Sequence, residues 1–475
     1  MKYEVTIGLE THVELATNSK IFCSCGGHSS PKEPNDCVCP ACSGMPGMLP
    51  VMNKKVVELA VTAGLMLGCY INRYTTFDKK NYYYPDLPCA YQITQLFSPI
   101  CVNGKVSVTT KNGVSEIGIK QIHMEEDAGK LVHDDWMDVS YVDFNRTSVP
   151  LIEIVTHPDF HSADEVLAYL EMLKSMFRFG NISECEEGAM RCDVNLSVRP
   201  EGATELGVRT EMKNMSSLAA IERAIKYETA RHIDALERGT EVLVQETRRW
   251  DDTKGRTFPM RNKETEADYR YFPDPNLMPI VIDDEWMDEI KAKMPVSADV
   301  KAKEYADAGI SEKEIEMLVS ERKVCDLLDD TAALGCNKKE VAAWILTDCA
   351  GILRKNALLL SDLNISAQAL STIIKKVGEG KINRGIGKKV LTAVIEKGVD
   401  PEAYIKENSL DVQVDEGFIS GVIDKAILAN PAAVADYKGG KEKALQAIFG
   451  ACMRELRGSG DPAVIKSLLE QKLKD

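Results

Sequence analysis

The sequence predicts an α+β protein in which a sheet domain comes first and an all-helical part follows. Over about the first 290 residues, apolar and polar positions alternate with the two-residue period of β-strands. This part also contains 24 of the 30 aromatic residues, which sets its composition apart from the rest of the chain. From about Pro295 the sequence is rich in Ala, Lys, Glu and Leu at helical spacing, as in residues 340–346 and 443–449. We therefore expect a domain boundary near residues 285–300.

Two helices should interrupt the strands of the first part. The earlier begins with a capping box from Ser162 to Glu165, continues with apolar residues at helical spacing and ends before Gly180. The later runs from about Ser217 to Gly239.

Length and composition indicate a globular protein of two or three domains. Of 475 residues, 44% are hydrophobic and 28% charged, and no apolar run approaches the roughly 20 residues that span a bilayer. The first residues lack the features of a signal peptide, so we expect a cytoplasmic protein without membrane contact. The net charge of −15 opposes general attraction to nucleic acid, so any RNA contact must be local.

Two basic stretches near the end of the chain suit such a local contact. They contain Lys375, Lys376, Lys381, Arg384, Lys388 and Lys389, and then Lys438, Lys441, Lys443, Arg454 and Arg457. Charge alone favours the simpler interpretation of two solvated helix faces.

Four predicted strands place polar side chains on one face and apolar side chains on the other. Residues two apart along a strand share a face. The polar faces are Glu10, His12 and Glu14; Gln121, His123 and Glu125; Arg191, Asp193, Asn195 and Ser197; and Arg209, Glu211 and Lys213. Carboxylates therefore recur on all four strands.

Any one of these strands is most simply the solvated surface of a sheet. A solvated face, however, has no need of Glu, His and Glu in one strand and of Arg, Asp and Asn in another. Mg²⁺ prefers oxygen ligands and usually binds through a few carboxylates together with nucleotide phosphates, while Arg and Lys can offset phosphate charge. The joint pattern predicts an ATP and Mg²⁺ site on an open sheet. The sequence has no P-loop or dinucleotide-binding glycine motif.

Five of the fourteen cysteines fall within residues 23–42. Residues 39–44, Cys-Pro-Ala-Cys-Ser-Gly, have the form of a zinc knuckle, whose tight turn points two thiolates at one metal. Four thiolates leave no open coordination position, so this stretch predicts a structural Zn²⁺ site with the ligands Cys23, Cys25, Cys39 and Cys42. Cys37 and His28 are further candidate ligands, and free thiols are the alternative interpretation.

Seven motifs, in order along the chain, carry a resemblance to a known family. They are IGLETHVEL (7–15), NYYYPDLP (81–88), HMEEDAGK (123–130), DFNRT (143–147), GAMRCDVN (188–195), RTEMKN (209–214) and DYRYFPDP (268–275). On these residues the sequence closely resembles the GatB family, the B subunits of the Asp/Glu-tRNA amidotransferases GatCAB.

The resemblance implies three domains. Residues 1–294 would form an antiparallel-sheet cradle resembling the glutamine synthetase catalytic fold, with the zinc knuckle at 23–42. Residues 295–405 would form a helical linker, and residues 406–475 a helical tail of the YqeY type. The cradle would bind ATP, Mg²⁺ and the acylated end of a tRNA, and the tail would contact the tRNA body.

The resemblance also assigns site residues at matching positions. The implied Mg²⁺ ligands, with Asp193 nearby, are Glu10, His12, Glu125 and Glu211. Lys79 and Arg191 would contact phosphate or the reaction intermediate, and for each of them a surface ion pair is the simpler alternative.

The implied reaction is the ATP-dependent transamidation of Glu-tRNA(Gln), Asp-tRNA(Asn) or both. The sequence has neither an amidase Ser-Ser-Lys signature nor an N-terminal glutaminase cysteine. The resemblance therefore implies a heterotrimer with a glutaminase A subunit and a small C subunit. Three residues at two places depart from the family pattern: Cys89-Ala90 stands where Lys-Gly is usual, and Ser148 replaces the usual Gly.

Two other functions stay open on the residues alone. A stand-alone ATP-dependent ligase for a small γ-carboxyl substrate would use the same carboxylates but leaves the basic tail unexplained. A zinc-containing RNA-binding protein without catalysis would use the knuckle and the tail. It leaves unexplained the group Glu10, His12, Glu125 and Glu211.

Overall fold

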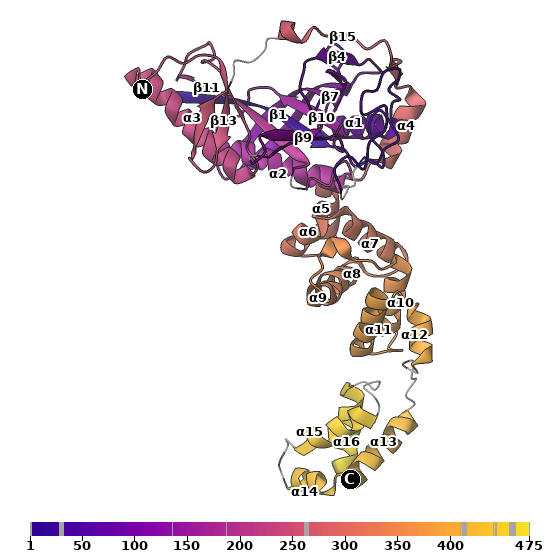
Figure 1. Cartoon of the computed structure of the whole chain (residues 1–475). Coiled ribbons are helices and arrows are strands. Elements are labelled where there is room, and N and C mark those ends of the chain that lie inside the picture. Colours follow the sequence, from indigo (N-terminus) through magenta and orange to yellow (C-terminus); the bar gives the residue numbers. More distant parts are fainter. Residues whose placement is uncertain are drawn as a thin grey trace. The chain divides into compact units, whose positions relative to one another are not determined.

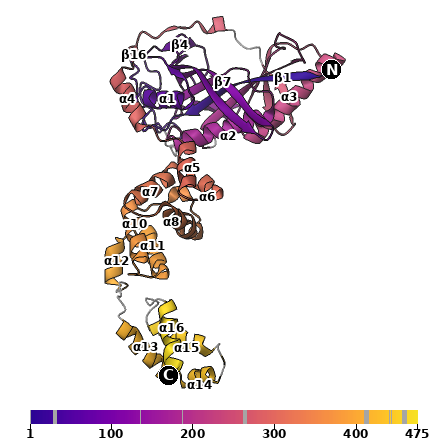
Figure 2. The same ribbon diagram turned by 180° about the vertical axis from the view of Figure 1, so that it is seen from behind.

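The computed structural model describes residues 2–27, 33–134, 136–186, 188–260, 266–408, 410, 416–439, 441, 444–455 and 462–474. The chain forms two compact units, Met1–Ser297 and Ala298–Asp475. The first unit contains a large sheet with helices against it, and the second is helical (Figures 1 and 2). The chain is thus a mixed α and β protein, and the predicted three-domain boundaries stay predictions.

Within the described part of the first unit, nine strands form one sheet in the order β14-β13-β12-β11-β1-β10-β7-β6-β2. They are β1 (Tyr3–Glu14), β2 (Tyr70–Ile71), β6 (Cys101–Thr110), β7 (Gly113–Glu126), β10 (Pro150–Thr156), β11 (Met190–Pro200), β12 (Thr210–Lys213), β13 (Glu246–Asp251) and β14 (Arg256–Pro259). Three small sheets join β15 (Phe272–Pro273), β4 (Asp78–Asn81) and β5 (Tyr91–Thr94); β16 (Ile280–Val281) and β3 (Tyr74–Thr75); and β8 (Lys130–Asp134) and β9 (Val139–Asp143).

The expectation of an antiparallel sheet is wrong for one pair of strands. All neighbours in the large sheet are antiparallel except β12 and β13, which are parallel. Helix α3 (Leu218–Arg238) lies between these two strands in the sequence. It carries the chain back to the end of the sheet at which β12 began, so both strands run in the same direction. The sheet is therefore mixed, and its likeness to the glutamine synthetase fold stays a prediction.

Three helices cover the apolar face of the sheet: α1 (Lys54–Met66), α2 (Ala163–Phe179) and α3 (Figure 1). The alternation of β1 explains this packing, because Ile7, Leu9 and Val13 are fully buried in the same hydrophobic cluster as the inner residues of the helices. The predicted capping box of α2 is confirmed, with Ser162 and Glu165 bonded reciprocally. Helix α4 (Asp284–Lys293) packs beside α1.

The second unit consists of helices and their short connections. Its elements are α5 (Ala298–Asp307), α6 (Glu312–Val319), α7 (Arg322–Ala333), α8 (Lys338–Ala343), a π-helical turn (Trp344–Cys349), α9 (Ala350–Lys355), α10 (Ala367–Gly378), α11 (Arg384–Lys397), α12 (Pro401–Glu407), α13 (Glu416–Ala429), α14 (Pro431–Lys438), α15 (Ala444–Glu455) and α16 (Pro462–Lys474). Buried residues of α13, α15 and α16 form a hydrophobic cluster. None of the helices in the described ranges is both long and apolar enough to cross a membrane.

A buried polar network fixes α3 to the edge strands of the sheet. Glu228 is fully buried, and its carboxylate accepts hydrogen bonds from Thr257 and, at 2.8 Å, from Arg231. The Nε2 atom of His232 lies 2.9 Å from the Thr210 hydroxyl and 3.3 Å from Arg231. Because an arginine only donates, Nε2 accepts and the imidazole is neutral. Burial, reinforced by the charge of Arg231, lowers the pKa of His232 to about 4.

This low pKa makes the first unit sensitive to acid. An unfolded His232 takes up a proton below its ordinary value of 6.5, whereas the folded one does so only near 4. Stability is therefore expected to fall as the pH drops from about 6.5 to about 4, by up to about 3 kcal/mol. In His232→Gln, which does not titrate, unfolding by urea should depend less on pH across this window. An identical pH dependence in the variant and the parent would contradict the assignment.

Candidate active site

Strand β1 lies in the middle of a row of charged side chains on the face of the sheet opposite the helices. In its two pairings, His12 is in register with Glu153 of β10 and with Arg191 of β11, and Glu10 is in register with Asp193 of β11. The next strands outward continue the row, because β7 pairs His123 with Glu153 and β12 pairs Glu211 with Asn195. The predicted polar face is thus a continuous surface of the folded sheet.

The first group on this face, the histidine–glutamate group, consists of His12, Glu125 and Glu153. One ligand atom of each lies within 4.8 Å of the others. The Nε2 atom of His12 is 3.2 Å from Glu125 and 3.5 Å from Glu153, and His123 approaches Glu153 to 2.8 Å. Burial by itself raises the pKa of Glu125, but hydrogen bonds from His12 and His123 outweigh it and lower this pKa to about 2. Against the effect of burial, the charge of His123 and a hydrogen bond from His12 likewise lower the pKa of Glu153, so both carboxylates are ionised in a largely buried place.

The second group, the acidic triad, consists of Glu10, Asp193 and Glu211, whose ligand atoms also lie within 4.8 Å of one another. Two neutral donors bind its carboxylates: Asn195 donates to Glu10 at 3.0 Å, and Thr247 donates to Glu211 at 2.7 Å. The ammonium group of Lys213 contacts both Asp193 and Glu211. Carboxylate oxygens in such a triad are suited to a hard divalent cation.

The four predicted Mg²⁺ ligands divide between these groups. His12 and Glu125 belong to the histidine–glutamate group, whereas Glu10 and Glu211 belong to the acidic triad, where Asp193 joins them. Sequence reasoning did not select Glu153. Its signal was visible, because Glu153 is the one charged residue in the otherwise apolar segment 150–155.

The two predicted phosphate contacts lie in different places. Arg191 is on the row beside His12, and its guanidinium group is paired with the buried Asp127. Lys79 lies on β4 of a small sheet, where its ammonium group is 3.6 Å from Asp274 and 4.1 Å from the centroid of the Tyr91 ring. Both residues are thus engaged in buried or partly buried ion pairs, and only Arg191 shares the strand row with the two groups.

The cysteine cluster has the predicted composition. Sulfur atoms of Cys23, Cys25, Cys39 and Cys42 lie within 4.8 Å of one another, and all fourteen cysteines are free. The thiol of Cys37 instead points to the backbone carbonyl of Gly26 at 3.5 Å, and the candidate His28 lies outside the described residues. Four converging thiols form a set that could hold one metal ion.

A fully buried lysine supports this cluster from inside. The ammonium group of Lys20 lies 3.6 Å from the Cys42 sulfur and donates to the backbone carbonyl of Cys37 at 2.9 Å. Its third neighbour is the carbonyl of Phe144 at 3.5 Å. A hydrogen bond from Cys23, together with the charge of Lys20, lowers the pKa of Cys42 to about 4. Sequence analysis missed Lys20, because its burial depends on the distant residues around Phe144.

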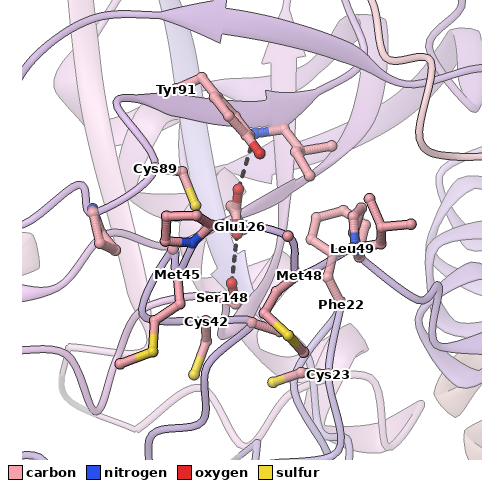
Figure 3. A pocket seen from close by; sticks show the side chains of 17 residues that line it. Phe22, Cys23, Cys42, Met45, Met48, Leu49, Cys89, Tyr91, Glu126 and Ser148 are labelled. Atoms are coloured by element: carbon pink, nitrogen blue, oxygen red, sulfur yellow. Dashed lines mark hydrogen bonds between the residues drawn. The ribbon is translucent and has the colours of Figure 1, made fainter.

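A cavity of about 240 Å³ adjoins the cysteine cluster, and Glu126, the neighbour of Glu125, is among its lining residues. Figure 3 shows the Glu126 carboxylate hydrogen bonded to Ser148, and it also accepts from the backbone of Ile93. Burial raises the pKa of Glu126 to about 7. Two of the three residues that depart from the family pattern, Cys89 and Ser148, line this cavity.

The basic stretches of the second unit are largely paired within the chain. Arg384 and Lys388 contact the buried Asp348 of the π-helical turn at 3.0 and 2.8 Å. Lys441 contacts Asp436 at 3.0 Å, and Lys443 and Arg457 lie outside the described residues. A phosphate would therefore have to compete with carboxylates for several of these side chains.

Comparison with known proteins identifies the family of the chain. The GatB/GatE catalytic domain family matches residues 5–288, and the GatB domain family matches residues 326–473. The chain belongs to the GatB family. It is 47% identical over 482 residues to the B subunit of the aspartyl/glutamyl-tRNA(Asn/Gln) amidotransferase of Lachnospira eligens, covering 99% of both chains. The protein of the same name from Caldicellulosiruptor bescii is 46% identical, with 100% of this chain and 99% of the relative covered.

The family matches also place the two groups. The acidic triad and the histidine–glutamate group lie entirely within residues 5–288, the part that matches the catalytic domain. The basic stretches fall within residues 326–473, the part that matches the second family. The assignment of the chain by its sequence motifs is therefore confirmed.

Proposed function

We propose that this chain is the activating subunit of a tRNA-dependent amidotransferase, a ligase that forms a carbon–nitrogen bond. It would phosphorylate the side-chain carboxylate of Glu-tRNA(Gln), Asp-tRNA(Asn) or both with ATP, and then amidate it with ammonia. The supporting observation is the pair of ligand groups on one sheet face of a chain that matches subunits of this name along its whole length.

The donor atoms of both groups fit divalent cations. The acidic triad offers oxygen alone, as Mg²⁺ prefers, and the histidine–glutamate group adds an imidazole nitrogen. Glu10 and Glu211 would thus serve one position, and His12 and Glu125 the other, with Asp193 and Glu153 as further ligands. When bound there, Mg²⁺ would offset charge on the phosphates of ATP.

The cationic side chains of the face would serve the phosphoryl group. Arg191 lies in register with His12 and is partly exposed, so its guanidinium group can meet a phosphate approaching the row. Lys213 adds a second positive charge beside the acidic triad. For Lys79 we keep the role that the family resemblance implies, a contact to phosphate or to the intermediate.

The chemistry explains why activation is needed. A carboxylate reacts poorly with an amine, because its oxygen is a poor leaving group. Transfer of the γ-phosphoryl group of ATP to a carboxylate oxygen gives an acyl phosphate and ADP. Attack of ammonia on the acyl carbon then breaks the carbon–oxygen bond and releases phosphate, while positive groups offset the developing charge.

The ammonia would come from a partner. Free ammonia is mostly protonated at neutral pH and then has no lone pair for attack, so direct delivery from a glutaminase subunit suits the reaction. We therefore propose a heterotrimer with a glutaminase A subunit and a small C subunit, which acts on tRNA(Gln), tRNA(Asn) or both. The tail of residues 406–475 would contact the tRNA body.

For the cysteine cluster we propose a structural Zn²⁺ ion. Four thiols from two short segments converge there, and a tetrahedral Cys₄ set keeps no position for a substrate. Such an ion would join the segment that carries Cys23 and Cys25 to the segment that carries Cys39 and Cys42.

One comparison separates this proposal from its two rivals. The purified complex is incubated with Glu-tRNA(Gln), ATP and glutamine, and the isolated chain with Glu-tRNA(Gln), ATP and free ammonium. The proposal expects Gln-tRNA(Gln) in the first reaction and a smaller yield in the second. Amidation of free glutamate without tRNA would favour the small-substrate ligase, and tRNA binding without any ATP use would favour the RNA-binding protein.

Glu125→Gln and Glu211→Gln should each slow formation of the phosphorylated intermediate by at least about 100-fold, which amounts to its loss in practice. Each substitution removes a charged ligand that phosphoryl transfer needs. The glutaminase activity of the partner should stay measurable. Transfer of ³²P from ATP to the acylated tRNA provides the measurement. Glu116→Gln, an exposed carboxylate on the same strand as Glu125, is the matched control. Retained phosphoryl transfer in both variants would contradict the site.

Deletion of the residues after about 405 should weaken tRNA binding far more than ATP use. Fewer phosphate contacts would also reduce the dependence of affinity on salt. Filter binding across a salt series, with the ATPase rate in parallel, tests both expectations. Unchanged tRNA affinity would contradict this role and favour the interpretation of the basic residues as solvated helix faces.

Lys20→Met should reduce Zn²⁺ retention by about tenfold or more, since outer groups that bond to metal ligands commonly contribute that much. The zinc content after dialysis against a chelator provides the measurement. Lys111→Met, at an exposed lysine, is the control. Equal zinc retention in all three proteins would show that the buried ammonium group does not support the cluster.

A further inference from the structure

The parallel pair of strands gives one carboxylate of the acidic triad an unexpected neighbour. In the register of β12 and β13, Glu211 is the partner of Thr247. The two side chains lie on the same face of the sheet, and the Thr247 hydroxyl donates to Oε2 of Glu211 at 2.7 Å. Thr247 is separated from Glu211 by 36 residues, including the whole of α3, so only the fold brings them together.

This hydrogen bond distinguishes the two oxygens of Glu211. Oε2 is held by Thr247, whereas Oε1 lies on the side of Asp193, because the Lys213 ammonium group contacts both Oε1 and Asp193. Both Glu211 and Thr247 are buried, so water has little access to compete for the hydroxyl. The rotation of the Glu211 carboxylate about its Cγ–Cδ bond is therefore fixed, with Oε1 turned toward Asp193.

A second carboxylate of the triad is held in the same manner. Asn195 of β11 donates from its amide nitrogen to Oε1 of Glu10 at 3.0 Å, so this bond engages one of the two oxygens of that carboxylate. Asn195 is itself the register partner of Glu211. Two neutral donors, each on the strand next to the carboxylate that it binds, thus engage one oxygen of Glu10 and one of Glu211.

We propose that Thr247 and Asn195 are positioning residues that aim one oxygen of Glu211 and one oxygen of Glu10, respectively, at a shared divalent cation. Neither side chain would contact the reacting atoms. A neutral donor is suited to this task, because it orients a carboxylate without neutralising the charge that attracts the cation. The inference rests on the proposed function for the cation site and adds the residues that order its ligands.

The binding of Mn²⁺ to the full-length chain tests this role without any activity measurement. The electron paramagnetic resonance signal of free Mn²⁺ measures how much of the ion stays unbound. The Mn²⁺ binding that is lost in Glu211→Gln is the class of binding that belongs to the triad. Thr247→Val keeps the shape but removes the hydroxyl, and Thr247→Ser keeps the hydroxyl. Thr6→Val is the control, because Thr6 is a buried threonine of β1 whose hydroxyl has no hydrogen-bond partner among the described residues.

We expect Thr247→Val to weaken this class of Mn²⁺ binding by about tenfold or more, as for other groups that orient metal ligands. Thr247→Ser should stay within about threefold of the parent, and Thr6→Val should bind as the parent does. Asn195→Leu should weaken the same class, and it carries the test alone if the Thr247→Val chain does not fold.

Three results would decide against the inference. Parental Mn²⁺ affinity in Thr247→Val and Asn195→Leu would overturn it while leaving the site itself intact. Equal loss in Thr247→Val and Thr247→Ser would show that packing, and not the hydroxyl, matters. If the parent showed no Mn²⁺ binding that Glu211→Gln removes, the proposed cation site itself would fail, a result distinct from the other two.

Discussion

The pairing of β1 on both of its edges is the constraint on which the candidate site depends. Because β1 buries Ile7, Leu9 and Val13 under three helices, a slip of one residue would turn its charged side chains into the hydrophobic core. The core therefore fixes the register of β1. That register in turn sets Glu10 and His12 beside the charged residues of the adjoining strands. The geometry of the polar face is thus determined by the burial of the apolar one.

Such a face concentrates like charges, which oppose folding unless they are compensated. Glu10 and Asp193 are directly in register, an arrangement that is unfavourable for two carboxylates on neighbouring strands. The structure compensates with Lys213 between Asp193 and Glu211, and with histidines beside Glu125 and Glu153. Lys213, His12 and His123 thus offset part of the negative charge of this face. The fold thus accepts an electrostatic cost at the place where a cation and phosphates would bind.

What the sequence could predict was local. The two-residue period of a strand places Glu10 with His12, and knuckle spacing places Cys39 with Cys42, without knowledge of the rest of the fold. Pairings between distant segments could not be predicted in this way. Glu153 and Thr247 reach the site only through the strand order, and the parallel pair depends on the crossover by α3. Likewise the partner of Lys79, Asp274, lies almost two hundred residues further along the chain.

Polar contacts on either side of the short backbone stretch 144–146 connect the cysteine cluster with the strand row. Lys20 contacts Cys42 and the carbonyl of Phe144; two residues later Arg146 lies 3.2 Å from Asp127, which also pairs with Arg191 beside His12. Lys20 and Asp127 are both buried. If the neighbours of either residue moved away, its buried charge would be uncompensated, which would lower the free energy of unfolding by on the order of 3–5 kcal/mol. Ordering of the cluster therefore constrains the turn at Phe144, and this turn constrains the arginine that faces the row. The cysteine cluster and Arg191 are thus linked through Lys20, the turn at Phe144 and the buried Asp127.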